Sequence, residues 1–449
     1  MGQTNDRKRS KKEMLRRKKK KLRLRVRKHN SLLLILFLAV VLLLNVLGLI
    51  SKDQTFSDNE NRTMASFPEL TKEAVLDGSF MSDLESWFSD QFFARKSWIT
   101  LKVTADRLMG KKESNGVYLG SSGYLMEVPS EPDEVWFDKN LDAINDFAAR
   151  HSELNIYMSV IPNAAYILTD YAPSLAPIRD QSEDIQAIKD KLGAAVTFMD
   201  MTDTMSEHQS EGIYYKTDHH WTSLGAYYAF NAMASTLGID NPATAYDIYT
   251  VTDSFQGTMA SKSGVYSTTD AVQIYVPLVE SNEFLVTYTD TGTETCSLYD
   301  SSALEAKDKY TVFFGGNHPM IDISTTNNND RVLLLIKDSY ANCMVQFLTP
   351  YFEKIIIVDP RYYYDDLESM ISKQGVTDVF FLYNVNTYLE DTSLADTLAV
   401  SEEEDLSDVY ADAVEAAGEG TDEDSETEET EETGEISEDE DAEGEDSDE

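Results

Sequence analysis

Short apolar runs separated by amphipathic stretches fill most of the chain between residues 135 and 390. The runs NIYMSVI (155–161), VLLLI (332–336), KIIIV (354–358) and VFFLY (379–383) are rich in β-branched and aromatic residues and do not alternate with polar ones. Such a run is typical of a strand that is buried on both faces of a sheet. Together with the helical stretches between them, the runs predict a three-layer α/β/α domain on a mainly parallel sheet.

The intervening segments predict the rest of the domain. Apolar residues three and four apart predict helices at LDAINDFAARH (141–151), SEDIQAIKDKL (182–192) and SLGAYYAFNAMASTLGI (223–239). The runs AVTFMDM (195–201) and TVFFGG (311–316) are predicted to be two further strands. Upstream, helical spacing between 76 and 110 predicts one or two amphipathic helices, and GVYLGSSGYLME (116–127) predicts a hairpin.

One apolar run is much longer than the others. Residues 31–50, SLLLILFLAVVLLLNVLGLI, are interrupted only by Ser31, Asn45 and Gly48. Twenty helical residues extend about 30 Å, the thickness of the hydrocarbon core of a bilayer. The run therefore predicts a transmembrane helix. Because no convincing small-residue cleavage site follows, we expect an uncleaved anchor rather than a removed signal peptide.

Charge is distributed in three unlike blocks along the chain. Residues 1–30 contain 15 Lys and Arg against Asp6 and Glu13, whereas residues 402–449 contain 26 acidic residues and no basic one. Taken alone, the basic block would suggest a nucleic-acid-binding arm, but its position before the apolar run indicates a cytoplasmic flank. We therefore expect everything after Ser51 to lie outside the cell, and we expect no nucleic-acid partner.

Five segments follow from these patterns. The acidic end cannot bury enough apolar surface to offset its chain entropy, so it is predicted to be disordered. The two cysteines, Cys296 and Cys343, are too few for a disulfide framework, and they could pair or remain thiols. The predicted segments are a basic cytoplasmic tail (1–30), a transmembrane anchor (31–50), a stalk with helices (51–110), a catalytic domain (111–398) and an acidic tail (399–449).

A serine follows the predicted strand at 332–336 directly. Lys337, Asp338 and Ser339 come next, and a helical pattern begins at once. In an open α/β sheet, ligands bind at the carboxyl ends of the strands, where the N–H groups of a following helix can stabilise an oxyanion. Ser339 is therefore a candidate nucleophile. Equally, Asp338 or Ser339 could simply cap the helix.

A serine nucleophile needs a base and a residue that orients the base, and TDHHWT (217–222) contains both. In an extended backbone, residues two apart point to the same side, so Asp218 and His220 can meet while His219 faces away. Asp218 would then accept the Nδ1–H of His220 and leave Nε2 for the Ser339 proton. Two other interpretations stay open, namely a metal site at Asp218, His219 and His220, or histidines buried for structural reasons.

The motif pair TDHHWT and KDSYAN (337–342) resembles the DHHW family. That family is similar to the alginate O-acetyltransferases of the AlgJ and AlgX type, within the SGNH-hydrolase-like superfamily. The resemblance extends over about residues 57–390, and it includes ENRTMASFPEL (60–70), GVYLGSSGYLME, VIPNAAYIL (160–168) and VDPRYY (358–363). Two features depart from the pattern: Lys337 replaces a glycine that often precedes Asp-Ser, and the oxyanion-hole residues cannot be assigned cleanly.

Carried over residue by residue, the resemblance implies a triad of Ser339 as nucleophile, His220 as base and Asp218 as orienting acid. His219 and Trp221 are then candidates for lining the site. The other candidates, for the oxyanion hole or for substrate binding, are Gly316, Asn317, Asn384, Asn386 and Arg361. Arg361 would hold an anionic acceptor, although a salt bridge with a neighbouring acid is the simpler interpretation.

The implied activity is extracytoplasmic transfer of acetyl groups to a cell-envelope polysaccharide, without a cofactor or a metal. The expected donor is a membrane acyltransferase of the MBOAT type, because acetyl-CoA is not available outside the cell. Two alternatives stay open: an extracellular esterase with the same triad, and a non-catalytic glycan-binding scaffold that retains the fold.

Overall fold

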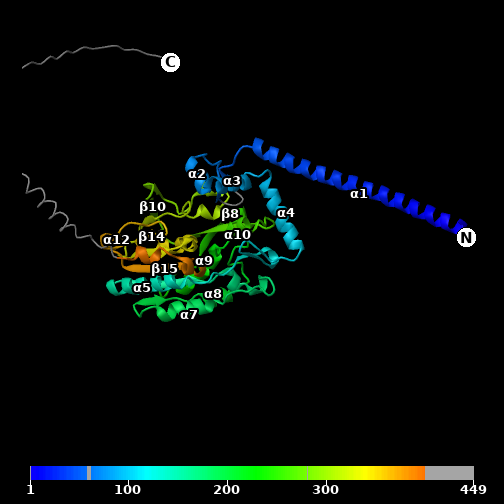
Figure 1. Ribbon diagram of the computed structural model, residues 1–449. Coiled ribbons are helices and arrows are strands. Elements are labelled where there is room, and N and C mark those ends of the chain that lie inside the picture. Colours follow the sequence, from blue (N-terminus) through cyan, green and yellow to red (C-terminus); the bar gives the residue numbers. More distant parts are fainter. Residues whose placement is uncertain (1, 58–61, 281, 400–449) are drawn as a thin grey trace, which may run out of the picture. The chain divides into compact units, whose positions relative to one another are not determined.

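Eight strands form the central sheet of the protein. The structure is a computed structural model (Figure 1), and it describes residues 2–57, 62–280 and 282–399. In spatial order the strands are β11 (Thr293–Thr295), β10 (Phe284–Tyr288), β12 (Met320–Thr325), β14 (Lys354–Val358), β13 (Val332–Lys337), β15 (Asp378–Asn384), β6 (Asn155–Ile161) and β7 (Val196–Phe198). The five strands from β14 to β7 run parallel to one another. The predicted mainly parallel α/β sheet is thus confirmed, and it gains an antiparallel extension at β12, β10 and β11.

Both faces of the sheet are covered, because successive residues of each strand point to opposite sides. In β13, Leu334 and Ile336 pack into one apolar cluster, while Leu333 and Leu335 pack into another. The first cluster contains residues of α5 (Glu134–Arg150), α7 (Gln181–Lys191), α12 (Leu367–Gln374), α13 (Val385–Glu390) and α14 (Leu394–Thr397). The second contains residues of α6 (Ala164–Ile167), α8 (Thr202–Glu207), α9 (Ser223–Met233) and α11 (Val345–Leu348).

The N-terminal elements agree with the sequence patterns. Helix α1 (Gly2–Ile50) is long and apolar enough, over Arg16–Ile50, to cross a membrane. One or two amphipathic helices were expected between 76 and 110, and the structure has two there, α3 (Ser79–Asp90) and α4 (Arg95–Leu108). The predicted hairpin is formed by β4 (Val117–Leu119) and β5 (Leu125–Glu127). The remaining elements here are β1 (Phe56–Ser57), β2 (Arg62–Thr63), α2 (Lys72–Asp77) and β3 (Glu113–Ser114).

A separate antiparallel pair lies outside the central sheet. It consists of β8 (Tyr246–Phe255) and β9 (Asp270–Pro277), with α10 (Thr258–Ser263) in the connection between them. This pair was not predicted. The end of β8 and the start of β9 nevertheless lie next to the candidate site. Short 3-10 turns complete the described chain: η1 (Ser121–Gly123), η2 (Thr169–Tyr171), η3 (Ser301–Leu304), η4 (Lys309–Val312), η5 (Ser339–Cys343) and η6 (Thr349–Tyr351).

The predicted strand at 311–316 is wrong. Asp308 caps the 3-10 turn η4 with its side chain, and the three residues after Phe313 have positive φ angles of 66°, 78° and 129°. An extended strand cannot contain such a run, and the two glycines supply the freedom that the left-handed conformation requires. The strand that joins the sheet instead is β12. The predicted acidic tail lies, apart from residue 399, outside the described residues.

Candidate active site

Ser339 lies at the carboxyl end of the central strand β13. Asp338 caps the turn η5, because its Oδ1 accepts from the Tyr340 N–H at 2.9 Å and its Oδ2 accepts from the Asn384 N–H at 2.8 Å. The cap is therefore Asp338, and this leaves the Ser339 hydroxyl available for other contacts. The continuous helix expected after Ser339 is in fact a 3-10 turn followed by the short α11.

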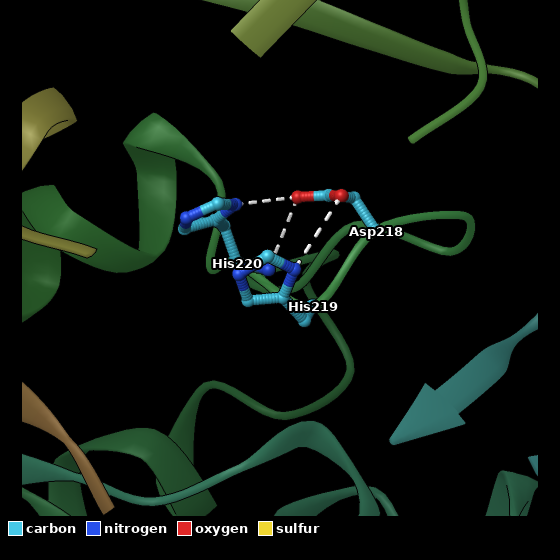
Figure 2. A group of neighbouring side chains, drawn as sticks. All are labelled: Asp218, His219 and His220. Atoms are coloured by element: carbon cyan, nitrogen blue, oxygen red, sulfur yellow. Dashed lines mark hydrogen bonds and ion pairs between the residues drawn. The ribbon is translucent and has the colours of Figure 1, made fainter. Parts of the chain in front are cut away.

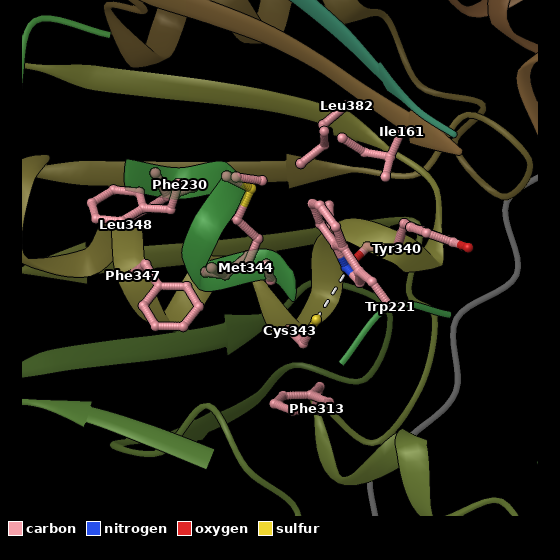
Figure 3. Close-up of a cluster of buried hydrophobic side chains, with 14 of the residues drawn as sticks. Ile161, Trp221, Phe230, Phe313, Tyr340, Cys343, Met344, Phe347, Leu348 and Leu382 are labelled. Atoms are coloured by element: carbon pink, nitrogen blue, oxygen red, sulfur yellow. Dashed lines mark hydrogen bonds between the residues drawn. The ribbon is translucent and has the colours of Figure 1, made fainter. Parts of the chain in front are cut away.

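The motif 217–222 lies in a tight loop between α8 and α9. Tyr214 and Trp221 pair as an isolated antiparallel bridge, and both side chains are buried. The Trp221 indole N–H donates to the Tyr340 carbonyl at 2.8 Å. Figure 3 shows Trp221 and Tyr340 in one apolar cluster with Met344 and Phe347, residues that follow Ser339. Trp221 is therefore a core residue that fixes the loop 217–222 against the turn η5, which begins at Ser339 and is called the serine turn below.

Asp218, His220 and Ser339 form a continuous hydrogen-bonded series. The Nδ1 of His220 lies 2.5 Å from the Asp218 Oδ2, and the Nε2 of His220 lies 2.8 Å from the Ser339 Oγ. Asp218 and His220 are buried, and Ser339 is half-buried. With the Nδ1 proton directed at the carboxylate, Nε2 is free to accept the serine proton, as a Ser-His-Asp triad requires.

His219 does not face away from Asp218, contrary to the simple strand argument. The loop bends instead of remaining extended, and the two imidazole centroids lie 3.9 Å apart. Figure 2 shows both rings beside the Asp218 carboxylate, with the Nδ1 of His219 3.7 Å from Oδ1. Thr258 links His219 to Asp218, because its hydroxyl donates to the Asp218 Oδ1 at 2.8 Å and accepts from the His219 Nδ1 at 2.6 Å.

Residues far from the motif in sequence hold it in place. The Asp270 carboxylate accepts from the backbone N–H groups of Lys216 and Thr217, at 3.0 and 2.7 Å, and from the Thr217 hydroxyl at 2.6 Å. The Tyr310 ring stacks on His220 with centroids 3.9 Å apart, and its hydroxyl donates to the Ser339 carbonyl at 3.0 Å. Tyr310 thus contacts both the base and the serine turn. Neither Asp270 nor Tyr310 was predicted.

Burial and neighbouring charges set the protonation of the triad. Burial would raise the pKa of Asp218, but His219, His220 and the Thr258 N–H outweigh it and hold that pKa well below its usual value. Burial, helped by the proximity of His219, lowers the pKa of His220 from 6.5 to about 4. At neutral pH the pair is therefore a carboxylate and a neutral imidazole, the state in which a general base can act.

Lys337, the residue in the place of the glycine, belongs to a buried charge network. Its Nζ lies 3.3 Å from the Asp359 Oδ2, and Arg361 binds the same carboxylate through Nε at 2.8 Å and Nη2 at 2.6 Å. Burial alone would raise the pKa of Asp359, but the two cations lower it. The structure thus shows the salt bridge with a neighbouring acid that was the simpler interpretation of Arg361, whose side chain remains 33% exposed.

The candidates for the oxyanion hole differ in the hydrogen bonds that their side chains form. Asn384 is buried and caps α13, since its Oδ1 accepts from the Asn386 N–H at 3.0 Å and its Nδ2 donates to the Ile161 carbonyl at 3.0 Å. These contacts give Asn384 a structural role. Asn317, in the loop with Gly316, accepts from the side chain of Asn342 at 3.3 Å, and Asn342 belongs to the serine turn. Gly316 and Asn317 therefore remain predictions for the oxyanion hole.

A family match accompanies this geometry. Residues 60–121 and 118–358, more than half of the chain, match the profile of the family described as DHHW protein. The chain belongs to the DHHW protein family. Comparison with curated proteins finds no match.

The chain is also similar to solved structures, three of which have informative descriptions. A DHHW family protein from Eubacterium siraeum is 26% identical, with a TM-score of 0.56, and the match covers 64% of this chain and 95% of that one. Bacillus cereus PatB1, in a structure with a sulfonyl adduct, is 20% identical with a TM-score of 0.53, over 63% and 97% of the two chains. The O-acetyltransferase domain of Pseudomonas putida AlgJ is 15% identical with a TM-score of 0.40, over 63% and 98%.

Gly257 is a positioning residue of this DHHW protein that the sequence did not single out. A Cβ built on Gly257 would overlap the Asp218 side chain, because the backbone passes directly against it. Gly257→Ala should therefore displace the carboxylate, lower kcat for an acetyl ester, and cost about 1–3 kcal/mol in free energy of unfolding. Steady-state kinetics and denaturant unfolding measure the two effects.

Gly193→Ala is the matched control for this substitution. The Cβ of that residue would lie 3.3 Å from the Asn145 Oδ1, outside the site, and its backbone does not have positive φ. It should leave kcat unchanged. Wild-type kcat in Gly257→Ala would show that the position of Asp218 is not critical.

His219→Ala should cost less activity than His220→Ala. His219 contacts Asp218 through Thr258, whereas His220 contacts both Asp218 and Ser339 directly. The comparison requires kcat/KM for both variants with the same acetyl ester. A larger loss in His219→Ala would mean that the assignment within the histidine pair is reversed.

Proposed function

We propose that this DHHW protein is a membrane-anchored, extracytoplasmic O-acetyltransferase that acts through an acetyl-Ser339 intermediate. The observation that carries the proposal is the series from the Asp218 Oδ2 through His220 to the Ser339 Oγ, with contacts of 2.5 and 2.8 Å. The resemblance of the motif pair to the AlgJ and AlgX type makes acetyl the expected group and a cell-envelope polysaccharide the expected acceptor.

The first half of the reaction acylates the serine. His220 Nε2 takes the Ser339 proton while Oγ attacks the acetyl carbonyl, and the resulting imidazolium faces the Asp218 carboxylate. When the tetrahedral intermediate collapses, the bond between the acetyl carbon and the oxygen of the acetyl donor breaks. That oxygen leaves and receives the proton from His220. An MBOAT-type membrane acyltransferase is the proposed source of the acetyl group.

The second half transfers the acetyl group to the acceptor. Neutral His220 removes the proton of a sugar hydroxyl, whose oxygen attacks the ester carbonyl. Ser339 then leaves and regains its proton from His220. The same chemistry with water as acceptor would be an esterase reaction, so the two activities differ only in which hydroxyl reaches the acyl-enzyme.

The metal alternative uses the same residues. Ligand atoms of Asp218, His219 and His220 lie within 4.8 Å of one another. In the geometry described, however, the two ring nitrogens of His220 face Asp218 and Ser339, so binding an ion through this ring would break one of these contacts. The triad is therefore the better interpretation of the donor set.

The proposed test follows the acetyl group through both halves of the reaction, acylation of Ser339 and transfer to the acceptor. The full chain in detergent is mixed with a nitrophenyl acetate and quenched, and its mass should rise by about 42 Da, with the label on the Ser339 peptide. Added envelope oligosaccharides should then remove the label faster than water does and become acetylated themselves. Release to water at an unchanged rate would favour the esterase, and no adduct in a folded chain would favour the scaffold.

The acylation rate should depend on pH through His220. The active form of the base is neutral, and burial lowers its pKa from 6.5 to about 4. The rate should therefore stay level as pH falls through 6.5 and decline only as pH approaches about 4. Stopped-flow release of nitrophenol measures the profile, and circular dichroism at each pH verifies that the chain is folded. A midpoint at or above 6.5 would mean that pairing with Asp218 outweighs burial.

A further inference from the structure

Helix α4 carries apolar side chains on two different faces. Ile99 and Val103 pack against Met259, Ala260 and Val265, which attaches the helix to the rest of the domain. Trp98, Leu101 and Leu108, together with Met109 directly after the helix, are 43, 58, 84 and 74% exposed. These four residues recur at spacings that place them on one side of a helix, and we call them the exposed stripe.

The exposed stripe continues through aromatic contacts into α3. The rings of Phe92 and Trp98 lie 6.5 Å apart, and those of Phe88 and Phe92 lie 6.2 Å apart. Phe88 is itself 42% exposed. The exposed stripe and these aromatic rings thus form a contiguous series of apolar side chains from α4 to α3, and contiguous exposed apolar groups often mark an interaction surface.

Residues at the end of α1 contact α3 at the edge of this surface. The residues that line a common cleft there are, from α1, Leu44, Asn45, Gly48 and Leu49, from α3, Trp87 and Phe88, and, directly after α3, Gln91 and Phe92. The Trp87 indole donates to Asp53 at 2.8 Å, and the side chain of Gln91 bonds both backbone groups of Gln54. With Ile50 taken as the end of the membrane span, the α1 residues of the cleft lie up to about 9 Å inside that end, whereas Asp53 and Gln54 lie beyond it. This is the depth, about 5–10 Å, at which interfacial helices immerse their apolar faces.

Charge around α4 also differs from the rest of the chain. Residues 95–112 contain six Lys and Arg and one acidic residue, whereas residues 31–401 as a whole carry 23 basic and 52 acidic residues, a net of 23 − 52 = −29. A basic helix with an exposed apolar side that includes Trp and Leu is typical of binding to the surface of an anionic membrane.

We infer that α4, with the adjoining end of α3, lies in the outer interface of the membrane that α1 crosses, with the exposed stripe in the acyl region and its lysines and arginines among anionic head groups. This inference rests on the anchoring in the proposed function. It gives the catalytic domain a second attachment to the bilayer beyond the anchor, so that the site is held at a set height instead of on a free tether.

The test places nitroxide labels on the full chain in vesicles of phosphatidylcholine and phosphatidylglycerol, without any other protein. The background is Cys296→Ser, since Cys296 is exposed and Cys343 is buried. Leu101→Cys and Leu108→Cys report on the exposed stripe. Thr100→Cys is the matched control on the same helix, since adjacent positions are about 100° apart. Ile248→Cys, on β8, reports on the domain surface, and Leu36→Cys reports on the anchor.

Collisions with oxygen and with a water-soluble nickel chelate measure the depth of each label. The inference predicts that labels at 101 and 108 collide preferentially with oxygen, as the label at 36 does, while labels at 100 and 248 collide preferentially with nickel. Nickel-accessible labels at 101 and 108 would overturn it. If the label at 36 stays in the lipid in that case, the proposed anchoring survives. Formation of the acetyl adduct in the same samples tests the proposed chemistry separately.

Discussion

Replacing Ser339 with alanine should abolish the acetyl adduct and reduce turnover of an acetyl ester by about a factor of 10⁶ in kcat, the loss that removal of a serine nucleophile causes in comparable triads. The reason is that a methyl side chain at this position could not form the ester, whereas Asp218, His220 and Tyr310 would keep their mutual contacts. Intact mass after incubation with a nitrophenyl acetate and steady-state kinetics measure the two effects.

Loss of the Ser339 hydroxyl should barely affect folding. It removes one hydrogen bond, that to His220, which is worth about 1 kcal/mol net. Ser182→Ala is a suitable control, because its hydroxyl bonds to Asp180 at the start of α7, away from the triad. A full adduct in Ser339→Ala would place the nucleophile elsewhere and would refute the proposed mechanism.

The central sheet could be predicted because its signal is local. Strands such as β13 and β15 are buried on both faces, so nearly every residue is apolar, and the pattern is visible without knowledge of the neighbours. The positions of Ser339 and of the Asp218–His220 pair also follow from short-range rules, because one ends a buried strand and the other lies within a three-residue motif. Strands β10, β11 and β12 were missed because they are not continuous apolar runs: buried positions alternate with more exposed ones in β10 and β12, and β11 is Thr-Glu-Thr. The pairing of β10 with β12 also joins residues 33 to 41 positions apart, so it leaves no local signal.

The residues that hold the motif could not be predicted from local patterns. Thr258, Asp270 and Tyr310 lie 38 to 90 residues after His220 in the numbering, and nothing in their immediate sequence indicates that they contact it. The strand argument also failed for His219, because it assumed an extended backbone where the loop is bent. Both the supporting residues and the position of His219 depend on tertiary contacts. The β8–β9 pair supplies one of the contacting residues, Asp270, and the connection between the two strands supplies another, Thr258.

The role of Lys337 also depends on a residue that is distant in the sequence. In the sequence this lysine is visible only as a departure from the glycine that often precedes Asp-Ser. In the folded chain the side chain is buried and paired with Asp359, which also binds Arg361. A buried ion is retained only where it is paired, so the substitution makes sense only together with Asp359, 22 residues later.

Asp218→Asn should reduce kcat by about 10⁴ while leaving the fold intact. The Asp218 Oδ1 accepts from both the N–H and the hydroxyl of Thr258, at 2.8 Å each, and an asparagine oxygen would keep these two bonds. Its NH₂ group would then face the Nδ1 of His220, which would have to become an acceptor. The imidazole proton would move to Nε2, opposite Ser339, and that tautomer cannot take the serine proton.

Thr258→Val distinguishes this tautomer effect from a general loosening of the site. It removes the hydroxyl that links Asp218 to His219 but leaves the carboxylate in front of His220, so its loss of kcat should be much smaller. Nitrogen-15 shifts of His220 should show the Nδ1–H form in the wild type and in Thr258→Val, and the Nε2–H form in Asp218→Asn. Equal losses in the two variants, with the Nδ1–H form retained in both, would mean that Asp218 serves the loop and not the base.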